Sequence, residues 1–246
     1  MTVVATLQSN YIPWKGYFDL IASVDIFVLY DVVQYTKNDW RNRNKLIANG
    51  RPTWLTIPVR QTSLHQTIKE TEIASPAWAR KHWRTIENSY SRSSGFSTFG
   101  DDLHAIYDRA FELTRLSEIN RQFIDFCCYA LGIETRIIEV SELTAEPFFS
   151  PFDQNRFLAL DKTARLVQIC KALGASHYLS GSAAKSYLDT EAFAVEGIAC
   201  HWMEYSGYPE YPQKCSPFEH NVSVLDLILN TGRECRNFLG PTKNPA

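Results

Sequence analysis

The chain has 246 residues, enough for one large α/β domain or for one domain with a helical insertion. Hydrophobic residues make up 45% of it, and its formal net charge of −2 gives no reason to expect DNA or an anionic membrane as a partner. No stretch approaches the roughly 18 unbroken apolar residues that predict a membrane-spanning helix, and the start, "MTVVATLQSN", lacks the layout of a secretory signal. We therefore expect a soluble, cytoplasmic protein.

The first 31 residues predict a βαβ unit. "TVVATLQ" (2–8) is short and β-branched, as in a buried strand, and "DIFVLYD" (25–31) is a second apolar run. Between them, residues 14–23 have apolar side chains at helical spacing, and Pro13 suits the entry to a helix. Such a unit indicates neighbouring parallel strands with a right-handed crossover.

The middle of the chain changes character. "NKLIANGRPTWLTIPV" (44–59) predicts a β-hairpin around Asn49-Gly50. Ser75-Pro76 predicts the start of a helix that runs to about Tyr90, and a loop is expected over "RSSGFSTFGDD". Two more helices are expected at about 100–114 and 118–131, the second capped by Ser117 and ended by Gly132. The stretch of about 76–131 is thus predicted to be a helical insertion.

Strands and helices alternate again in the last part of the chain. The predicted elements are a strand in 134–143, a long loop from Thr144, a helix in 162–175, a short strand in 176–181, a helix begun by "SAAKSYLD", a strand in 197–205 and a helix in 223–232. The sequence therefore predicts a single α/β domain over 1–246, with a Rossmann-like, mainly parallel sheet, flanking helices, a β-hairpin excursion and the helical insertion.

The six cysteines point to no metal centre. They form no Cys-x-x-Cys pair and no Cys/His cluster with zinc-like spacing. Cys127, Cys128 and Cys170 lie inside apolar helical patterns and are expected in the core. Cys200 adjoins His201, but neighbours along a strand point to opposite faces, which disfavours a nucleophilic pair.

Three polar stretches follow predicted strands: Gln8-Ser9-Asn10-Tyr11, Asp31 with Gln34, and Ser180-Gly181-Ser182. In open α/β sheets, ligands bind beyond the carboxyl ends of the strands. If these strands are neighbours, the three stretches converge on one crevice.

Two stretches of the sequence, one of them the turn at Ser180–Ser182, have features of phosphate sites. "LSGSAAKSYL" (179–188) places a small-residue turn before a helix, with Lys185 about one turn in, although a simply capped helix with a solvated lysine fits equally. "KNDWRNRNK" (37–45) holds Arg41 and Arg43, whose forks can grip phosphates, and Asn44, which suits sugar hydroxyls. A solvated basic loop is the alternative for this second stretch.

His82 lies four residues after Trp78, so the two share a helix face. Histidine suits a general base near neutral pH, but an ordinary helix histidine satisfied by a neighbour also fits. "YPEYPQ" (208–213) predicts a stiff aromatic loop that can cover a ligand or stack on it.

Taken together, these motifs resemble the WbqC-like family. The resemblance is carried in order by "QSNYIPWKGYFD", "YDVVQYTKNDWRNRNKL" with "WLTIPV", "KTARLVQICKALGASHYLSGSAAKSYL", and the tail from "YPEYPQ" to "VSVLDLILNTG". It implies a protein of bacterial gene clusters for O-antigen and other surface polysaccharides, and leaves the reaction open. Ser9 departs from the family pattern, which usually has proline there. A fold-level analogy to pantothenate synthetases and related nucleotidylyl transferases is weakened because no His-x-Gly-His turn is present.

We therefore predict an enzyme of polysaccharide biosynthesis that transfers an acyl or aminoacyl group to a nucleotide-linked amino sugar, with ATP or a CoA thioester as the source of the donor. The predicted catalytic residues are His82, Lys185 and Arg43. The predicted substrate-binding residues are Gln8, Asn10, Tyr11, Trp14, Tyr17, Asp31, Gln34, Arg41, Asn44, Ser180, Gly181 and Ser182. A non-catalytic binding or assembly protein of the pathway, and sugar nucleotidylyl or glycosyl transfer, are the alternatives. A homo-oligomer is possible.

Overall fold

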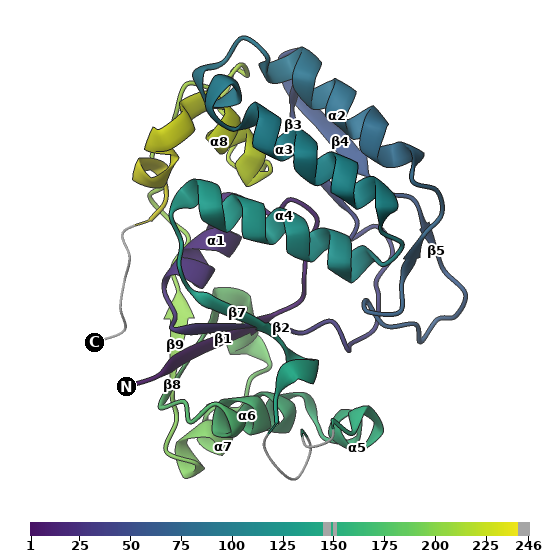
Figure 1. Cartoon of the computed structure of the whole chain (residues 1–246). Helices are drawn as coiled ribbons and strands as arrows, with labels where there is room; N and C mark the ends of the chain where they lie inside the picture. The colour runs from purple at the N-terminus through teal and green to yellow at the C-terminus, as the bar shows by residue number, and fades with distance from the viewer. Residues whose placement is uncertain (145–148, 150–151, 241–246) are drawn as a thin grey trace.

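The computed structural model describes residues 1–144, 149 and 152–240 (Figure 1). Its centre is a five-stranded, fully parallel sheet in the order β7-β2-β1-β8-β9. These strands are β1 (Val3–Leu7), β2 (Ile26–Leu29), β7 (Arg136–Glu139), β8 (His177–Gly181) and β9 (Ala199–Met203). Numbered along the chain, they run 3-2-1-4-5, the doubly wound order whose switch point lies between β1 and β8.

The remaining elements lie around this sheet. The helices are α1 (Lys15–Ala22), α2 (Ala77–Tyr90), α3 (Ser94–Glu112), α4 (Leu116–Leu131), α5 (Gln154–Ala159), α6 (Lys162–Ala172), α7 (Thr190–Val195) and α8 (Val224–Thr231). Two antiparallel pairs, β3 (Arg43–Ala48) with β4 (Arg51–Thr56) and β5 (Val59–Arg60) with β6 (Glu72–Ile73), and three 3₁₀ turns, η1 (Val140–Glu142), η2 (Ser182–Ser186) and η3 (Gly232–Phe238), complete the described elements.

Two hydrophobic clusters cover the two faces of the sheet. Alternate side chains of a strand point to opposite faces, so that Ala5 of β1 joins one cluster and Val4 the other. The larger cluster includes side chains of α1, α2, α3, α4 and α8, and the smaller one packs under α5, α6 and α7. Figure 1 shows the resulting layers, with α1 and α4 on one side of the sheet and α6 and α7 on the other.

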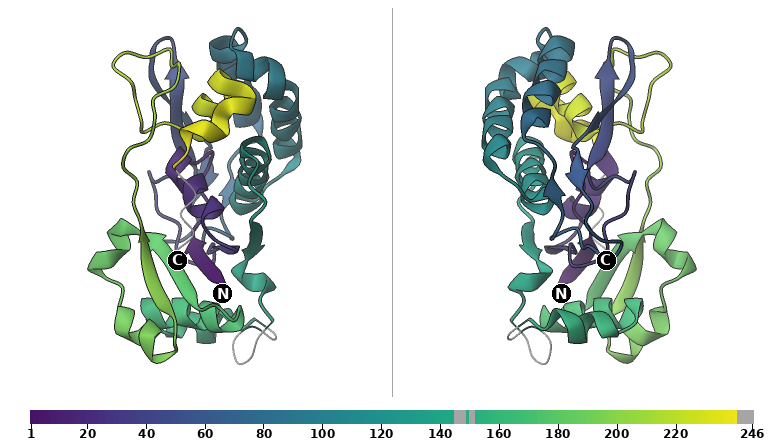
Figure 2. Two further views of the ribbon diagram at one scale, coloured as in Figure 1. Left: turned by 90° about the vertical axis from the view of Figure 1, so that its left-hand side faces the viewer. Right: turned by 90° about the vertical axis from the view of Figure 1, so that its right-hand side faces the viewer.

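The predicted fold class is confirmed: a parallel α/β sheet with flanking helices and a separate antiparallel hairpin. The turn at Asn49-Gly50 has positive φ at both positions, 53° and 72°, as a two-residue type I′ hairpin requires. Figure 2 shows the hairpin standing beside the long segment 204–222, which connects β9 to α8.

Four local predictions are wrong. The predicted loop before position 100 is the start of α3, and its glycine is needed there, because a Cβ on Gly95 would lie 2.1 Å from the carbonyl oxygen of Ile228 in α8. The N-cap of α4 is Arg115 rather than Ser117, which is buried. The expected helix after Ser180-Gly181 is the five-residue 3₁₀ turn η2, and part of the long loop is α5, capped by Asp153.

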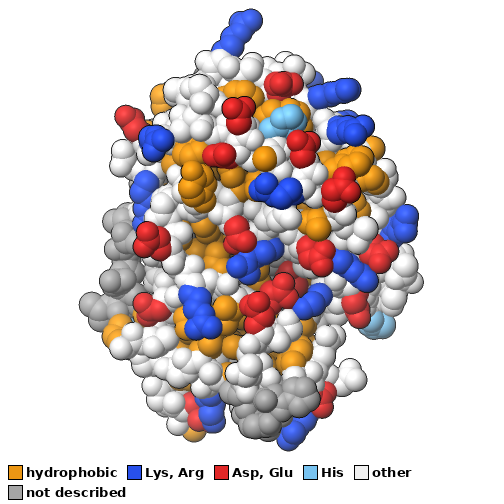
Figure 3. Space-filling view, viewed as in Figure 1, with side chains coloured by type: hydrophobic (Ala, Val, Ile, Leu, Met, Phe, Trp, Pro, Cys, Tyr) orange, Lys and Arg blue, Asp and Glu red, His pale blue; other side chains and the backbone are white. Residues whose placement is uncertain are grey.

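No helix in the described part of the chain is both long enough and apolar enough to cross a membrane. The face seen in Figure 3 mixes Lys and Arg with Asp and Glu side chains over its whole area. The three core cysteines, Cys127, Cys128 and Cys170, are buried as predicted, and all six cysteines are free.

Candidate functional site

The sheet opens at its switch point. β1 pairs with β2 over four positions and β8 pairs with β9 over five, but β1 and β8 pair only at Val3–His177 and Val4–Tyr178. The two strands therefore separate toward their carboxyl ends. This is the place where doubly wound sheets bind ligands, and the turn after β1 begins there.

A buried polar network holds this turn in place. The backbone N–H of Ser9 donates to Oδ1 of Asp31 at 2.8 Å, and Nδ2 of Asn120 donates to Oγ of Ser9 at 3.0 Å. Burial raises the pKa of the Asp31 carboxyl, although the bonds from Ser9 and the charge of Arg41 oppose that shift. A proline at position 9 has no N–H for this bond. Asp31 thus fixes the turn after β1 rather than facing a ligand.

The basic stretch folds back over the same turn. Arg41 donates from its guanidinium to Oδ1 of Asn10, and Nδ2 of Asn44 donates to the carbonyl of Ile12 at 2.9 Å. The N–H of Tyr11 donates to the carbonyl of Trp40 at 3.1 Å. The structure therefore brings together Asn10, Arg41 and Asn44, which the sequence predicts as site residues from two separate motifs.

A small pocket lies where these segments meet. It has a volume of about 220 Å³ and is lined by Asn10, Pro13, Trp14, Trp40, Asn44 and Asn221. The Asn10 Nδ2 and the side-chain amide of Asn221 form no hydrogen bond with any other described residue, so both are available to a ligand. Indole rings offer flat apolar faces and amides offer paired donors and acceptors. This combination suits a sugar ring or a heterocyclic base.

Trp14 is a fixed wall of the pocket. Its indole packs on Gly16, where a Cβ would lie 2.3 Å from the ring, and its ring centroid is 5.3 Å from that of Tyr205 and 6.1 Å from that of Tyr208. Gly16 therefore permits the close approach of this indole to the start of α1. Tyr205 also lies beside Gly181, so it links the turn after β1 to the turn after β8.

The segment 204–222 supplies Tyr205, Tyr208 and Asn221, and buried polar bonds hold it. The hydroxyl of Tyr208 donates to Oδ2 of Asp19 at 2.8 Å, and that of Tyr211 donates to Oδ2 of Asp226 at 2.7 Å. The "YPEYPQ" motif therefore packs behind the Trp14 wall through Tyr208 and does not line the pocket itself.

Lys15, outside the predicted set, anchors this segment as well. Its Nζ donates to the carbonyl of Pro209 at 3.3 Å and lies 4.8 Å from the ring centroid of Tyr208. Burial lowers the pKa of the Lys15 ammonium to about 8, and the nearby carboxylates of Asp19 and Glu210 oppose this shift. The sequence indicates this lysine only by its position beside Trp14 at the start of a helix, because its partner Pro209 lies 194 residues away.

His82 belongs to a buried network of rings. Its Nδ1 is 2.9 Å from the hydroxyl of Tyr11, which is 2.7 Å from the hydroxyl of Tyr107. Burial lowers the pKa of His82 to about 3, although a hydrogen bond with the Thr56 backbone opposes this shift. A histidine that stays neutral and bonded in this way is a weak base, so the arrangement favours a structural role. Tyr17 is also buried, and its hydroxyl donates to the carbonyl of Gln8 at 3.1 Å.

Other predicted residues lie away from the pocket. Nζ of Lys185 is 5.8 Å from the ring centroid of Trp202, on the face of the sheet that the smaller hydrophobic cluster covers. Ser182 and Lys185 are exposed around η2, and Ser180 precedes it. Gln34 is exposed and donates to the carbonyl of Leu64. Of the three polar stretches that the sequence predicts to converge, the structure joins only parts: Asp31 bonds to the turn after β1, and Gly181 approaches that turn through Tyr205.

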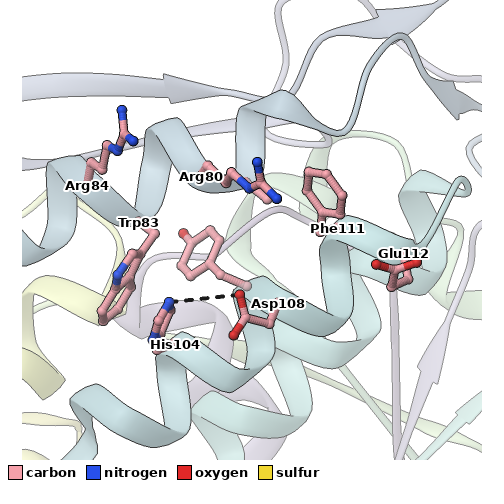
Figure 4. A pocket seen from close by; sticks show the side chains of 9 residues that line it. Arg80, Trp83, Arg84, His104, Asp108, Phe111 and Glu112 are labelled. Atoms are coloured by element: carbon pink, nitrogen blue, oxygen red, sulfur yellow. Dashed lines mark ion pairs between the residues drawn. The ribbon is translucent and has the colours of Figure 1, made fainter.

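A larger cavity of about 470 Å³ lies between α2 and α3, and Figure 4 shows its lining. Its lining holds both signs of charge, with Arg80 and Arg84 near Asp108 and Glu112. The Trp83 ring already stacks on two rings of the protein: its centroid is 4.4 Å from that of His104 and 5.8 Å from that of Phe96. The Trp14–Trp40 pocket, where Nδ2 of Asn10 and the side-chain amide of Asn221 have no described partner, is the better candidate site.

The structure defines an α/β protein with a doubly wound sheet and a small pocket, lined by aromatic and amide side chains, beyond its first strand. The WbqC-like protein family matches residues 8–238, and the chain belongs to this family. It is 42% identical over 240 residues to a protein of Mycobacterium tuberculosis (strain ATCC 25618 / H37Rv) described as "Uncharacterized protein Rv1507c", covering 97% of this chain and 98% of that one. No solved structure matches the chain.

Proposed function

We propose that this protein binds a nucleotide-linked amino sugar during the biosynthesis of a bacterial surface polysaccharide and transfers an acyl or aminoacyl group to the sugar amine. Membership of the WbqC-like family supports the polysaccharide context. The observation that carries the proposal is the pocket of two indole rings and three asparagine side chains beside the turn after β1. Its volume of about 220 Å³ suits one ring, because pockets for drug-sized ligands measure roughly 300–1,000 Å³.

The reaction requires little chemistry from the protein beyond positioning. The sugar amine attacks the acyl carbon of a thioester or an acyl adenylate, so that a C–N bond forms and a C–S or C–O bond breaks. The thiolate or AMP leaves with the bonding electrons, and the ammonium proton passes to solvent. Holding the amine and the acyl carbon close together in the correct orientation is itself a large part of such catalysis. Trp14, Trp40 and Asn221 would hold the sugar ring for this attack.

Calorimetric titration with UDP-glucosamine tests the binding. The variant Trp40→Ala should weaken it about 5- to 150-fold, since an aromatic stacking contact contributes roughly 1–3 kcal/mol. Asn221→Ala should weaken it as well, because the pocket then loses one amide. Tyr129→Ala, on an exposed ring of α4, is the matched control and should leave the affinity unchanged.

Mass spectrometry then tests the transfer. The protein is incubated with UDP-glucosamine and either acetyl-CoA or ATP with glycine, and the product is examined for a new amide. Amide formed by the wild type and reduced in Trp40→Ala supports the proposal. Tight binding without any new amide would instead identify a non-catalytic binding protein of the pathway, and release of free UDP would identify glycosyl transfer.

A further inference from the structure

A third cavity lies between the β3–β4 hairpin and α2. It has a volume of about 680 Å³, between β4 and the first half of α2, and is lined by Thr53, Trp54, Leu55, Thr56, Pro58, Ser75, Ala77, Trp78, Lys81, His82 and Thr85. This volume lies within the range of pockets that hold ligands of nucleotide size. The predicted site does not include Trp54 or Lys81.

The two cavities meet at a pair of tryptophans. Trp40 lines the small pocket and Trp54 lines the larger cavity, and their ring centroids are 5.6 Å apart. Each side chain is 43% exposed. A ligand that fills the small pocket with one ring can therefore continue over the Trp40–Trp54 pair into the larger cavity.

The larger cavity carries positive charge. Among the described residues that line it, Lys81 holds the only formal charge, because burial lowers the pKa of His82 to about 3. Arg43 lies next to the cavity: it pairs with Thr56 across the hairpin, and its guanidinium carbon is 4.2 Å from the ring centroid of Trp54. A guanidinium that rests its face on an indole keeps its N–H edge for an anion.

Arg43 also has an unused donor. Its Nε is buried and forms no hydrogen bond with any residue that the structure describes. No residue that the structure describes therefore fixes this side of the guanidinium by a hydrogen bond. By contrast, two arginines and two carboxylates line the cavity between α2 and α3, Arg80, Arg84, Asp108 and Glu112, so their charges cancel and give no net attraction for an anion there.

We propose that the cavity between β4 and α2 binds the diphosphate part of the substrate, with Arg43 and Lys81 on the phosphates and the base stacked on Trp54. This inference rests on the proposed function, because it places the sugar of the same molecule in the Trp14–Trp40 pocket. Of the two stretches that the sequence predicts as phosphate sites, it favours the one that holds Arg43 over the turn at Ser180–Ser182. A polyprenyl diphosphate shares this phosphate chemistry, and the experiment separates the two sources.

The experiment compares the affinities of the full chain for UDP, farnesyl diphosphate, UDP-glucosamine and free glucosamine. Lys81→Gln, at an exposed position, should weaken UDP about fivefold, as expected for one solvent-exposed ion pair. Arg43→Gln should weaken it about tenfold, and both variants should leave glucosamine unaffected. Trp54→Ala should weaken UDP more than farnesyl diphosphate. Arg84→Gln, also an exposed cation on α2 but outside the cavity, is the control.

The outcomes separate this inference from the proposed function. Equal UDP affinity in the wild type, Lys81→Gln and Arg43→Gln, with UDP-glucosamine still weakened by Trp40→Ala, would overturn the diphosphate site alone. Failure of the wild type to bind UDP-glucosamine or glucosamine would overturn the proposed function. UDP affinity that falls in Arg43→Gln and Lys81→Gln but is unchanged in Trp54→Ala would keep the diphosphate site and contradict the stacked base.

Discussion

Replacing Gly16 by alanine tests whether Trp14 is the fixed wall of the pocket. The new Cβ would lie 2.3–2.8 Å from three atoms of the Trp14 ring, so the indole must retreat by about 1 Å to reach the ordinary contact of 3.4 Å. Tyr205 and Tyr208 hold the ring from their side. Overpacking of this kind costs about 1–3 kcal/mol, whereas alanine in a helix gains about 0.5–1 kcal/mol over glycine. We expect a net loss of about 1–2 kcal/mol in the free energy of unfolding.

Urea denaturation followed by near-ultraviolet circular dichroism measures both consequences of Gly16→Ala. The free energy should fall, and the aromatic signal should change because Trp14 moves. The same variant should bind UDP-glucosamine more weakly than the wild type. Gly100→Ala is the control, because a Cβ there meets only the movable Phe96 ring at 3.0 Å.

A second substitution shows whether the effect passes through the indole. Trp14→Phe removes the atoms that the new Cβ meets, so Gly16→Ala should cost less in that background. The difference between the two costs is the coupling energy of the pair. A Gly16→Ala variant with unchanged stability and an unchanged aromatic spectrum would refute the packing of Trp14 on Gly16.

The remaining predictions concern the buried polar groups. The pKa of His82 is about 3 in the folded protein and about 6.5 in the unfolded chain, so the stability that it contributes is present above pH 6.5 and is lost as the pH falls. Between pH 6.5 and pH 5 the free energy of unfolding should fall by about 2 kcal/mol on this account, and His82→Gln, but not the exposed His104→Gln, should flatten the profile measured by urea titration. Asp226→Ala leaves the hydroxyls of Tyr90 and Tyr211 without their acceptor and should cost about 3–5 kcal/mol, whereas Tyr211→Phe should cost about 1–2 kcal/mol. An unchanged urea midpoint in Asp226→Ala would contradict the assigned network.

The parts of the fold that could be predicted are those whose cause is local. The first two strands are short apolar runs, and the Asn49-Gly50 turn needs two positive φ angles that these residue types tolerate best. The start of α3 was missed because glycine usually disfavours a helix, whereas Gly95 is required by the close approach of α8. Nothing within ten residues of Gly95 in the sequence indicates that contact.

The candidate site also contains residues that local sequence features predict and residues that only the fold brings there. Asn10 and Asn44 could be predicted because they follow a strand or lie in a polar, cation-rich motif. Asn221 could not, since it reaches the pocket from the other end of the chain through the segment 204–222. His82 has the residue type and spacing of a base, but its burial beside Tyr11 decides its protonation, and burial is a property of the fold.

The position of the pocket follows from what already fills the opening of the sheet. Tyr205 lies between Gly181 and Trp14, and the segment around Arg41 covers the turn after β1. The pocket is therefore lined by the turn after β1, by Trp40 and Asn44 and by Asn221, with no residue of the strands β1 or β8. The sheet fixes where the turn begins, while the hairpin and the segment 204–222 supply the surfaces that contact a ligand. Under the proposed function, differences in sugar preference between members of the family should follow the residues at positions 40 and 221 more closely than any residue of the sheet.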